Sequence, residues 1–384
     1  MTFLVLLFML LLYYNLRNKN YESGAKTFIF IVSVLLILLS GLRHEGVGND
    51  TYAYIMNYEN NADLSWKGVF DHYFIRFFSP ADNGEKDPGY LVFVKMMHTL
   101  HLNSRFYLFV IAVILITPFG FFIYHNSSNL KTVLFSYSFY LILFYGYLPN
   151  SAVRQSLALS FILWAYLLLM KNKLITCICL ITIGSMFHKS ALITLTIIPF
   201  LYTKNIQAIY KWILLPFVGI LMFPEAVAQF LVSENEIYSG YSSGTFYSSA
   251  GYSRPYMIIL LITFFYFLGW IYLNKINRYA ISKQQQILFL GCAYTFMLIP
   301  LIWVNPSALR IISYFGPCMA IVVGSCISKL KEMKLLFPLL ILVFFYKSIS
   351  QSDNYHFMWE KMEMHDRYAE YIPVNSEENS VNYI

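Results

Sequence analysis

The sequence predicts an all-α polytopic integral membrane protein with about twelve transmembrane helices. Of the 384 residues, 58% are hydrophobic and only 12% are charged, and the mean hydropathy is +0.56. A soluble protein carries about twice that fraction of charged residues. The apolar runs are continuous, whereas the strands of a membrane barrel alternate in polarity. Helices are therefore the structure that satisfies the backbone in lipid.

Twelve apolar segments can be delimited along the chain. They cover residues 3–16, 27–42, 105–124, 132–148, 153–170, 174–187, 190–202, 212–223, 255–273, 287–304, 311–328 and 335–346. Several are shorter than the roughly 20 residues that a perpendicular span requires, so some are expected to be half-helices or to dip into the bilayer. The first segment has no basic residue before Arg17, which argues against a cleaved signal peptide.

The basic residues indicate the orientation. Loops 17–26, 125–131, 171–173, 203–211, 274–284 and 329–334 hold 14 of the 27 Lys and Arg residues but only two acids. Short loops rich in Lys and Arg lie in the cytoplasm. Both termini are therefore expected outside. Residues 1–350 form the transmembrane domain, with two sizeable outer loops at 43–104 and 224–254, and residues 351–384 form an acidic, soluble outer tail.

Four polar islands interrupt the apolar sequence on the expected outer side. They are "RHEGVGND" after the second segment, "NSAVRQ" around Arg154, "FHKS" around His188 and "NPSALRIISYF" around Arg310. One interpretation is that each is an interfacial anchor, since Arg and Lys often mark helix ends. The other is that the four islands converge on one pocket. Anchors of this type favour the cytoplasmic side, which supports convergence.

The first island allows more than one role for its acidic end. Gly46 and Gly48 would let the backbone turn tightly above the membrane. Asp50 either caps the following helix, as Asp often does, or orients Arg43, or polarises a substrate hydroxyl.

The motifs in these islands resemble the EpsG family of Wzy-type polysaccharide polymerases. The match comprises an Arg with a following Gly-x-Asp and Tyr, then "DPGY", "VRQSLALS", "FHKSALI" and "LRIISYF", in the expected order over roughly residues 27–330. The matching positions are Arg43, Gly48, Asp50, Tyr54, Asp87, Tyr90, Arg154, Gln155, Ala158, His188, Ser190, Arg310 and Tyr314.

The resemblance implies a polymerase in the bacterial inner or plasma membrane with its active site on the outer side. Its substrate would be an oligosaccharide repeat unit on undecaprenyl diphosphate, and the growing glycan would pass from its lipid onto an incoming unit. Expected partners are this lipid-linked substrate, membrane lipids, a chain-length regulator and a flippase; nucleic acid is not expected.

Residue chemistry fits this reaction. Arginine is the natural bidentate partner of a diphosphate at a low-dielectric boundary, so Arg43, Arg154 and Arg310 are expected to clamp it. Gln155, Tyr314, Tyr54 and Asp87 are the other expected substrate-binding residues. The acceptor hydroxyl needs a base, for which His188, Asp50 and Glu45 are the candidates.

The absence of several motifs argues against nucleotide-dependent and metal-dependent chemistry. The chain has no Walker A loop, no Asp-x-Asp and no His-Glu-x-x-His, and its five cysteines all lie in apolar segments, so we expect no metal and no cofactor. A flippase for the same lipid-linked sugars is the main alternative, but a translocation path needs charges near the bilayer midplane. Here the charges gather at one face. A non-catalytic subunit of a polysaccharide assembly is the second alternative.

Overall fold

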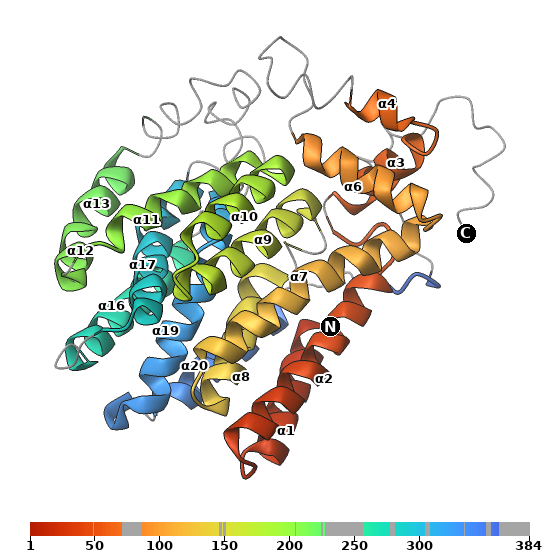
Figure 1. The fold of residues 1–384 in the computed structure, drawn as a ribbon. Coiled ribbons are helices and arrows are strands. Elements are labelled where there is room, and N and C mark those ends of the chain that lie inside the picture. Colours follow the sequence, from red (N-terminus) through yellow and green to blue (C-terminus); the bar gives the residue numbers. More distant parts are fainter. Residues whose placement is uncertain are drawn as a thin grey trace.

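The computed structural model describes residues 1–48, 50–70, 87–145, 148, 151–203, 205–223, 226, 256–276, 281–303, 308–333, 335–350 and 355–360. Within these ranges the chain is helical apart from turns and one backbone bridge between Arg43 and Phe357. The helices form one bundle (Figure 1). Loop 224–254 lies outside the described residues apart from residue 226, as do 71–86 of the first outer loop and 361–384 of the tail.

Each of the twelve expected segments coincides with one helix or with two consecutive helices. They are α1 (Thr2–Leu16), α2 (Tyr21–Gly41), α7 (Ser104–Asn126), α8 with a π turn (Leu130–Tyr140, Leu141–Tyr145), α9 (Val153–Met170), α10 (Leu174–Phe187), η3 with α11 (Lys189–Thr196, Ile197–Phe200), α12 with α13 (Ile206–Trp212, Leu214–Met222), α16 (Tyr256–Ile276), α17 with η5 (Lys283–Leu298, Ile299–Trp303), α18 with α19 (Leu309–Ser313, Gly316–Lys329) and α20 (Leu336–Ser350).

Five of these helices are long and apolar enough to cross a membrane. They are α2, α7, α9, α16 and α17 with its 3₁₀ extension, and the other seven apolar helices have 10–17 residues. A span perpendicular to the bilayer takes about 20 residues. The molecule is thus an all-helical, membrane-embedded protein, in which five of the twelve expected segments reach spanning length within the described ranges.

Several helix boundaries differ from those expected, and two of these differences have a clear local reason. Helix α2 begins at Tyr21 rather than at residue 27, because the Asn20 side chain accepts a hydrogen bond from the Ser23 N–H and caps the helix. The expected helix 311–328 is divided between α18 and α19. Pro317 lies in the first turn of α19, where its missing N–H is tolerated, so the chain turns at residues 314–315.

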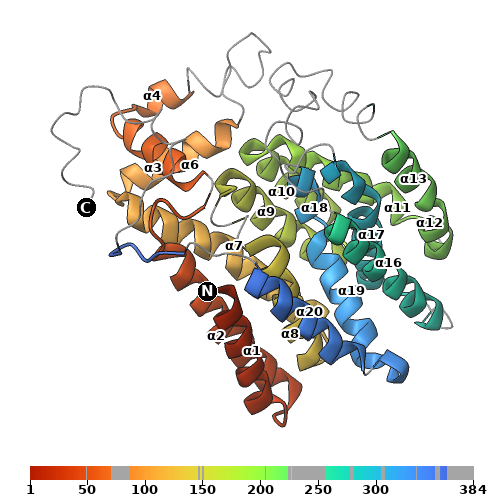
Figure 2. The ribbon, with the colours of Figure 1, turned by 180° about the vertical axis from the view of Figure 1, so that it is seen from behind.

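One continuous hydrophobic core joins α1 to α20. Helix α2 packs along α7, α9 along α10, and α19 against both α8 and α17. Figure 2 shows α20 on the far side, beside α8 and α19. The many aromatic side chains fill this core in ring pairs such as Phe217 on Phe296, with centroids 4.0 Å apart.

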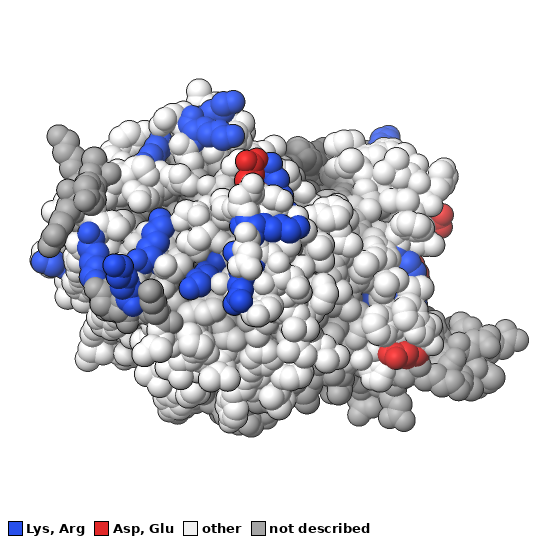
Figure 3. Space-filling model, turned by 90° about the horizontal axis from the view of Figure 1, so that it is seen from below, with Lys and Arg blue, Asp and Glu red and all other residues white. Residues whose placement is uncertain are grey.

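The basic loops meet at one end of the bundle, which we call the basic end. It comprises the turns α1–α2, α7–α8 and α9–α10 and the adjoining ends of α16, α17 and α19. Hydrogen bonds tie these turns together: Tyr21 Oη donates to the Ser127 carbonyl over 2.7 Å, and Lys283 Nζ to Asn172 Oδ1 over 2.9 Å. Figure 3 shows Lys and Arg side chains gathered over this face.

At the opposite end, three further helices cover the bundle: α3 (Thr51–Asn60), α4 (Trp66–Val69) and α6 (Pro88–Thr99). A second, smaller core packs α3 and α6 onto the first turns of α7 and α9. Gly89 lets α6 lie close to α10, because a Cβ there would be 2.9 Å from the Cβ and the carbonyl oxygen of Met186 on α10. Gly48 precedes α3 with a φ of 95°, a conformation that glycine adopts without strain.

Candidate functional site

The first charged pair at this end joins α6 to α9. Arg154, in the first turn of α9, donates from Nη1 to Asp87 Oδ2 over 3.1 Å. Its guanidinium also lies 5.7 Å from the ring centre of Tyr54 and 5.5 Å from that of Tyr90, within cation–π range. Asp87 is almost fully buried, while the Arg154 side chain remains 32% exposed. The pair therefore holds Arg154 in a fixed position with its outer edge accessible.

A second pair joins the short helix α18 to α3. Arg310 Nη2 lies 4.0 Å from Asp50 Oδ2, and 30% of the Arg310 side chain is exposed. Gln155, one residue beyond Arg154, donates from Nε2 to the Arg310 carbonyl and, over 2.5 Å, to Ser313 Oγ. These bonds fasten α18 to α9, so the two arginines sit on elements that are directly linked.

Asp50 and Asp87 occupy equivalent places in the chain. Each is the N-cap residue of a helix, α3 or α6, and neither makes a side-chain capping bond. Aspartate at such a position usually accepts from the first turn. Here each carboxylate faces an arginine on another element instead. The arginine that Asp50 faces is Arg310, whereas Arg43 was the partner in one of the three roles that the sequence left open for Asp50.

His188 lies at the end of α10, next to both arginines. Its Nδ1 is 2.6 Å from Ser190 Oγ, which in turn donates to the Tyr314 hydroxyl over 3.3 Å. Burial, and then the positive charges of Arg310 and Arg154, lower the pKa of His188 from 6.5 to about 3. The imidazole is therefore neutral at physiological pH.

Eight of the ten expected site residues thus come together, and we call them the site cluster. They are Asp50, Tyr54, Asp87, Arg154, Gln155, His188, Arg310 and Tyr314. They come from α3, α6, α9, the α10–η3 turn and α18. The cluster lies at the end of the bundle remote from the basic end.

Arg43 is placed differently from the expectation of a diphosphate ligand. It is 1% exposed, and its Nη1 donates to the carbonyl oxygen of Ser40 and, over 3.1 Å, to Ser40 Oγ. Burial lowers its pKa from 12.5 to about 10, so the side chain remains charged near neutral pH. An arginine with no accessible surface does not present its guanidinium to a ligand, and Arg43 is better suited to holding the end of α2.

The chain segment 355–360 covers Arg43, although residues 351–384 were expected to form a soluble outer tail. His44 N–H donates to the His356 carbonyl over 2.8 Å and Met358 N–H to the Leu42 carbonyl over 2.9 Å. The Tyr355 hydroxyl donates to the Leu39 carbonyl over 2.6 Å. This segment, seen in blue beside the end of α2 in Figure 1, is thus bound to the bundle rather than part of a soluble tail.

Glu45 lies outside the site cluster. It is partly exposed and acts electrostatically on the neighbouring His44, whose pKa is lowered chiefly by burial. Glu45 is therefore not placed among the residues that surround Arg154 and Arg310.

Several residues that support the site cluster were not among the expected site residues. The Lys189 backbone N–H donates to the Asp87 carboxylate, and Ser313 Oγ bridges Gln155 and the Arg310 carbonyl. Tyr90 shares a 2.7 Å hydrogen bond with buried Tyr107. Tyr90 belongs to the "DPGY" motif, whereas nothing in the sequence marks Ser313 or Tyr107.

The Asp87 carboxyl makes stability depend on pH. Burial raises its pKa from 3.8 to about 6, although Arg154 and Lys189 lower it in part. The folded protein holds this proton more tightly than the unfolded chain, so the stabilisation is complete below about pH 4 and is lost as pH rises through 6. Between pH 4.5 and 7.5 the wild type should therefore lose on the order of 2 kcal/mol relative to Asp87→Asn. Thermal unfolding of both proteins in detergent measures this, and parallel pH curves would contradict it.

Among the described residues, no group of three or more His, Cys, Asp and Glu side chains is arranged to hold a metal ion. The five cysteines are free thiols on apolar helices, as expected from the sequence.

Comparison with known proteins gives one match. The EpsG family model matches residues 26–359, which is most of the chain. The matched range includes every residue of the site cluster and residues 355–359 of the segment that covers Arg43. Neither curated proteins nor solved structures give a match.

Proposed function

Because the chain belongs to the EpsG family, a Wzy-type polymerase family, we propose that it polymerises a polysaccharide at the outer face of the bacterial inner or plasma membrane. The growing glycan would be transferred from undecaprenyl diphosphate onto an incoming lipid-linked repeat unit. The observation that carries this proposal is the convergence of two partly exposed arginines and a neutral histidine from three distant segments.

Arg154 and Arg310 are the proposed diphosphate ligands. About a third of each side chain is exposed, and each guanidinium is oriented by a carboxylate on another helix. A planar guanidinium can donate two parallel hydrogen bonds to a phosphate group. Two such groups would stabilise the charge that develops on the departing diphosphate, and Asp87 and Asp50 would hold them in position.

His188 is the proposed base. Since Ser190 Oγ donates to Tyr314, it can accept from an N–H at His188 Nδ1, which leaves the lone pair on Nε2. The acceptor sugar hydroxyl would attack the anomeric carbon and pass its proton to Nε2, while the bond from that carbon to the diphosphate oxygen breaks and the diphosphate takes the electron pair.

A pKa of about 3 makes His188 a weak base in the absence of ligand. Burial is the largest cause of that low pKa, and the charges of Arg310 and Arg154 lower it further. A bound diphosphate would neutralise these charges and so raise the pKa of His188 toward the reaction pH. The base would thus become effective when the donor is in place, which would limit unproductive proton transfer.

The proposed orientation predicts which residues are reachable from outside the cell. A cysteine at exposed position Asp63, after α3, should react with a membrane-impermeant thiol reagent applied to intact cells or right-side-out vesicles. A cysteine at exposed Lys171, at the basic end, should react only after the membrane is opened. A cysteine-free background serves as control, and the reverse pattern would place the site cluster in the cytoplasm and contradict the proposal.

A reconstituted assay tests the function itself. Purified protein in proteoliposomes, supplied with lipid-linked repeat units, should convert them into a ladder of longer lipid-linked glycans. The ladder should form equally well in EDTA, because the proposed chemistry relies on two arginines and a histidine rather than on a metal ion. Recovery of activity only on addition of magnesium or manganese would reject the metal-free mechanism, and absence of a ladder under both conditions would reject the polymerase.

A further inference from the structure

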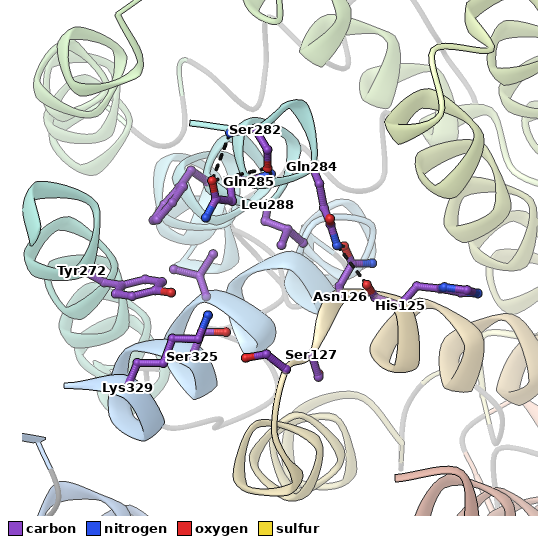
Figure 4. Close-up of a pocket in the computed structure, with 13 residues that line it drawn as sticks. His125, Asn126, Ser127, Tyr272, Ser282, Gln284, Gln285, Leu288, Ser325 and Lys329 are labelled. Carbon is purple, nitrogen blue, oxygen red and sulfur yellow. Dashed lines mark hydrogen bonds between the residues drawn. The ribbon is translucent and has the colours of Figure 1, made fainter. Parts of the chain in front are cut away.

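A cavity of about 490 Å³ opens at the basic end of the bundle, remote from the site cluster. Its walls come from the last turn of α7, from α16, from the first turns of α17 and from the last turn of α19 (Figure 4). None of these residues has a part in the proposed polymerisation.

The walls of this cavity favour an anion. They include the hydroxyl groups of Ser127, Tyr272 and Ser325 and the ammonium group of Lys329, and no lining residue is acidic. Helix α17 begins at the cavity with Ser282 as its N-cap, so the positive end of the helix dipole is directed toward this region. Hydroxyl donors, one cation and a helix N-terminus together match the chemistry of a phosphate group.

Ser127 supplies an independent indication. Its side chain is 8% exposed, and its Oγ is buried without a hydrogen-bond partner. A buried hydroxyl without a partner is unfavourable and calls for an explanation. The neighbouring amide of Gln284, by contrast, donates to the His125 carbonyl and to Asn126 Oδ1, each over 2.9 Å. In Figure 4 the Ser127 hydroxyl is turned toward the cavity, where a bound acceptor would satisfy it.

The position of the cavity indicates the source of the phosphate. It lies between the ends of α7 and α17, two of the helices long enough to span a membrane, and therefore near the boundary between lipid and water. Lys and Arg side chains gather over this end of the bundle (Figure 3). Basic pockets between transmembrane helices on the cytoplasmic side commonly hold anionic headgroups. We propose that this cavity binds the phosphate group of an anionic membrane lipid, with Ser127 and Lys329 as ligands.

The experiment compares lipid retention by native mass spectrometry. Protein in detergent is titrated with phosphatidylglycerol, using wild type, Lys329→Gln and Ser127→Ala, with Lys331→Gln as the matched control. Lys331 carries the same charge at the same end and is exposed but does not line the cavity. Both cavity variants should bind the lipid roughly tenfold more weakly, since each lacks a hydrogen bond to a charged group, and the control should match the wild type.

A second arm separates the two sources of phosphate. A contrary result would be that millimolar inorganic phosphate stabilises the wild type but not Lys329→Gln, while lipid binding is the same in all variants. That result would assign the cavity to a soluble phosphate and contradict the proposed lipid ligand. Equal lipid retention in all four proteins with no effect of inorganic phosphate, or an equal loss in Lys331→Gln, would overturn the site. Lys329 is on the surface, so its substitution keeps the test valid if Ser127→Ala disturbs packing.

Discussion

Replacing Arg154 or Arg310 by Lys should reduce polymer formation by roughly 100-fold or more, about the effect of removing one donor from a transition-state binding site. Lysine keeps the positive charge but offers no planar fork for two parallel hydrogen bonds. A lysine at position 154 would also have to reach Asp87, whose carboxylate accepts a 3.1 Å hydrogen bond from Arg154 Nη1 in the wild type. Chain-length analysis of the glycan made by each variant measures the effect.

The matched control is Arg105→Lys. Arg105 is at the start of α7, at the same end of the bundle, and its charge lowers the pKa of His44, which is not a member of the site cluster. This variant should retain nearly all activity. Membrane insertion of each variant should be compared by quantifying the protein in membranes. Undiminished long chains in both Arg154→Lys and Arg310→Lys would mean that these residues are interfacial anchors.

The second large effect is expected for His188→Gln. A glutamine can still hydrogen-bond to Ser190, but it cannot accept a proton from the acceptor hydroxyl. Loss of general-base catalysis typically costs about 10²–10⁴ in rate. Cells carrying this variant should therefore display a single repeat unit in place of long chains, because export of the lipid-linked unit does not require polymerisation.

This phenotype also separates the polymerase from a flippase. If the protein moved the lipid-linked unit across the membrane, inactive variants would leave that unit on the cytoplasmic side and display none. In the reconstituted assay, the pH dependence of the wild-type rate should show a fall at low pH as His188 becomes protonated, because a charged imidazole has no lone pair to offer. The residual rate of His188→Gln should not fall at low pH. If the rates of both proteins fell at low pH, the base would be another group.

The sequence predicted the helices, because apolar runs require helices in lipid, which is a local pattern. Convergence of the polar islands was one of two interpretations, and the structure brings together residues of all four islands but leaves Arg43 and Glu45 outside the site cluster. The sequence did not predict that Asp50 would face Arg310. That pairing depends on how α3 lies over α18, two elements far apart in sequence, and local patterns carry no information about it.

Arg43 is a second case in which the sequence did not reveal a contact between distant segments. Its motif resembled that of a ligand-binding arginine, and its type and spacing could not reveal that residues 355–360 would cover it. The cavity beside Ser127 was not predicted either. Its lining comes from four helices, and in the sequence the polar residues of each helix look like those of any helix end. In both cases the missing information is the tertiary packing of segments that are separated by long stretches of chain.

The bond between Tyr355 and Leu39 joins residues 316 positions apart, which has a consequence for the order in which the protein matures during translation. Helix α2 is synthesised long before the segment that binds its end. The surroundings of Arg43 therefore remain open until residues 355–360 have been made. A chain terminated shortly after α20 would contain every residue of the site cluster and still lack the segment that covers Arg43, so the polymer formed by such a chain would measure what residues 355–360 contribute.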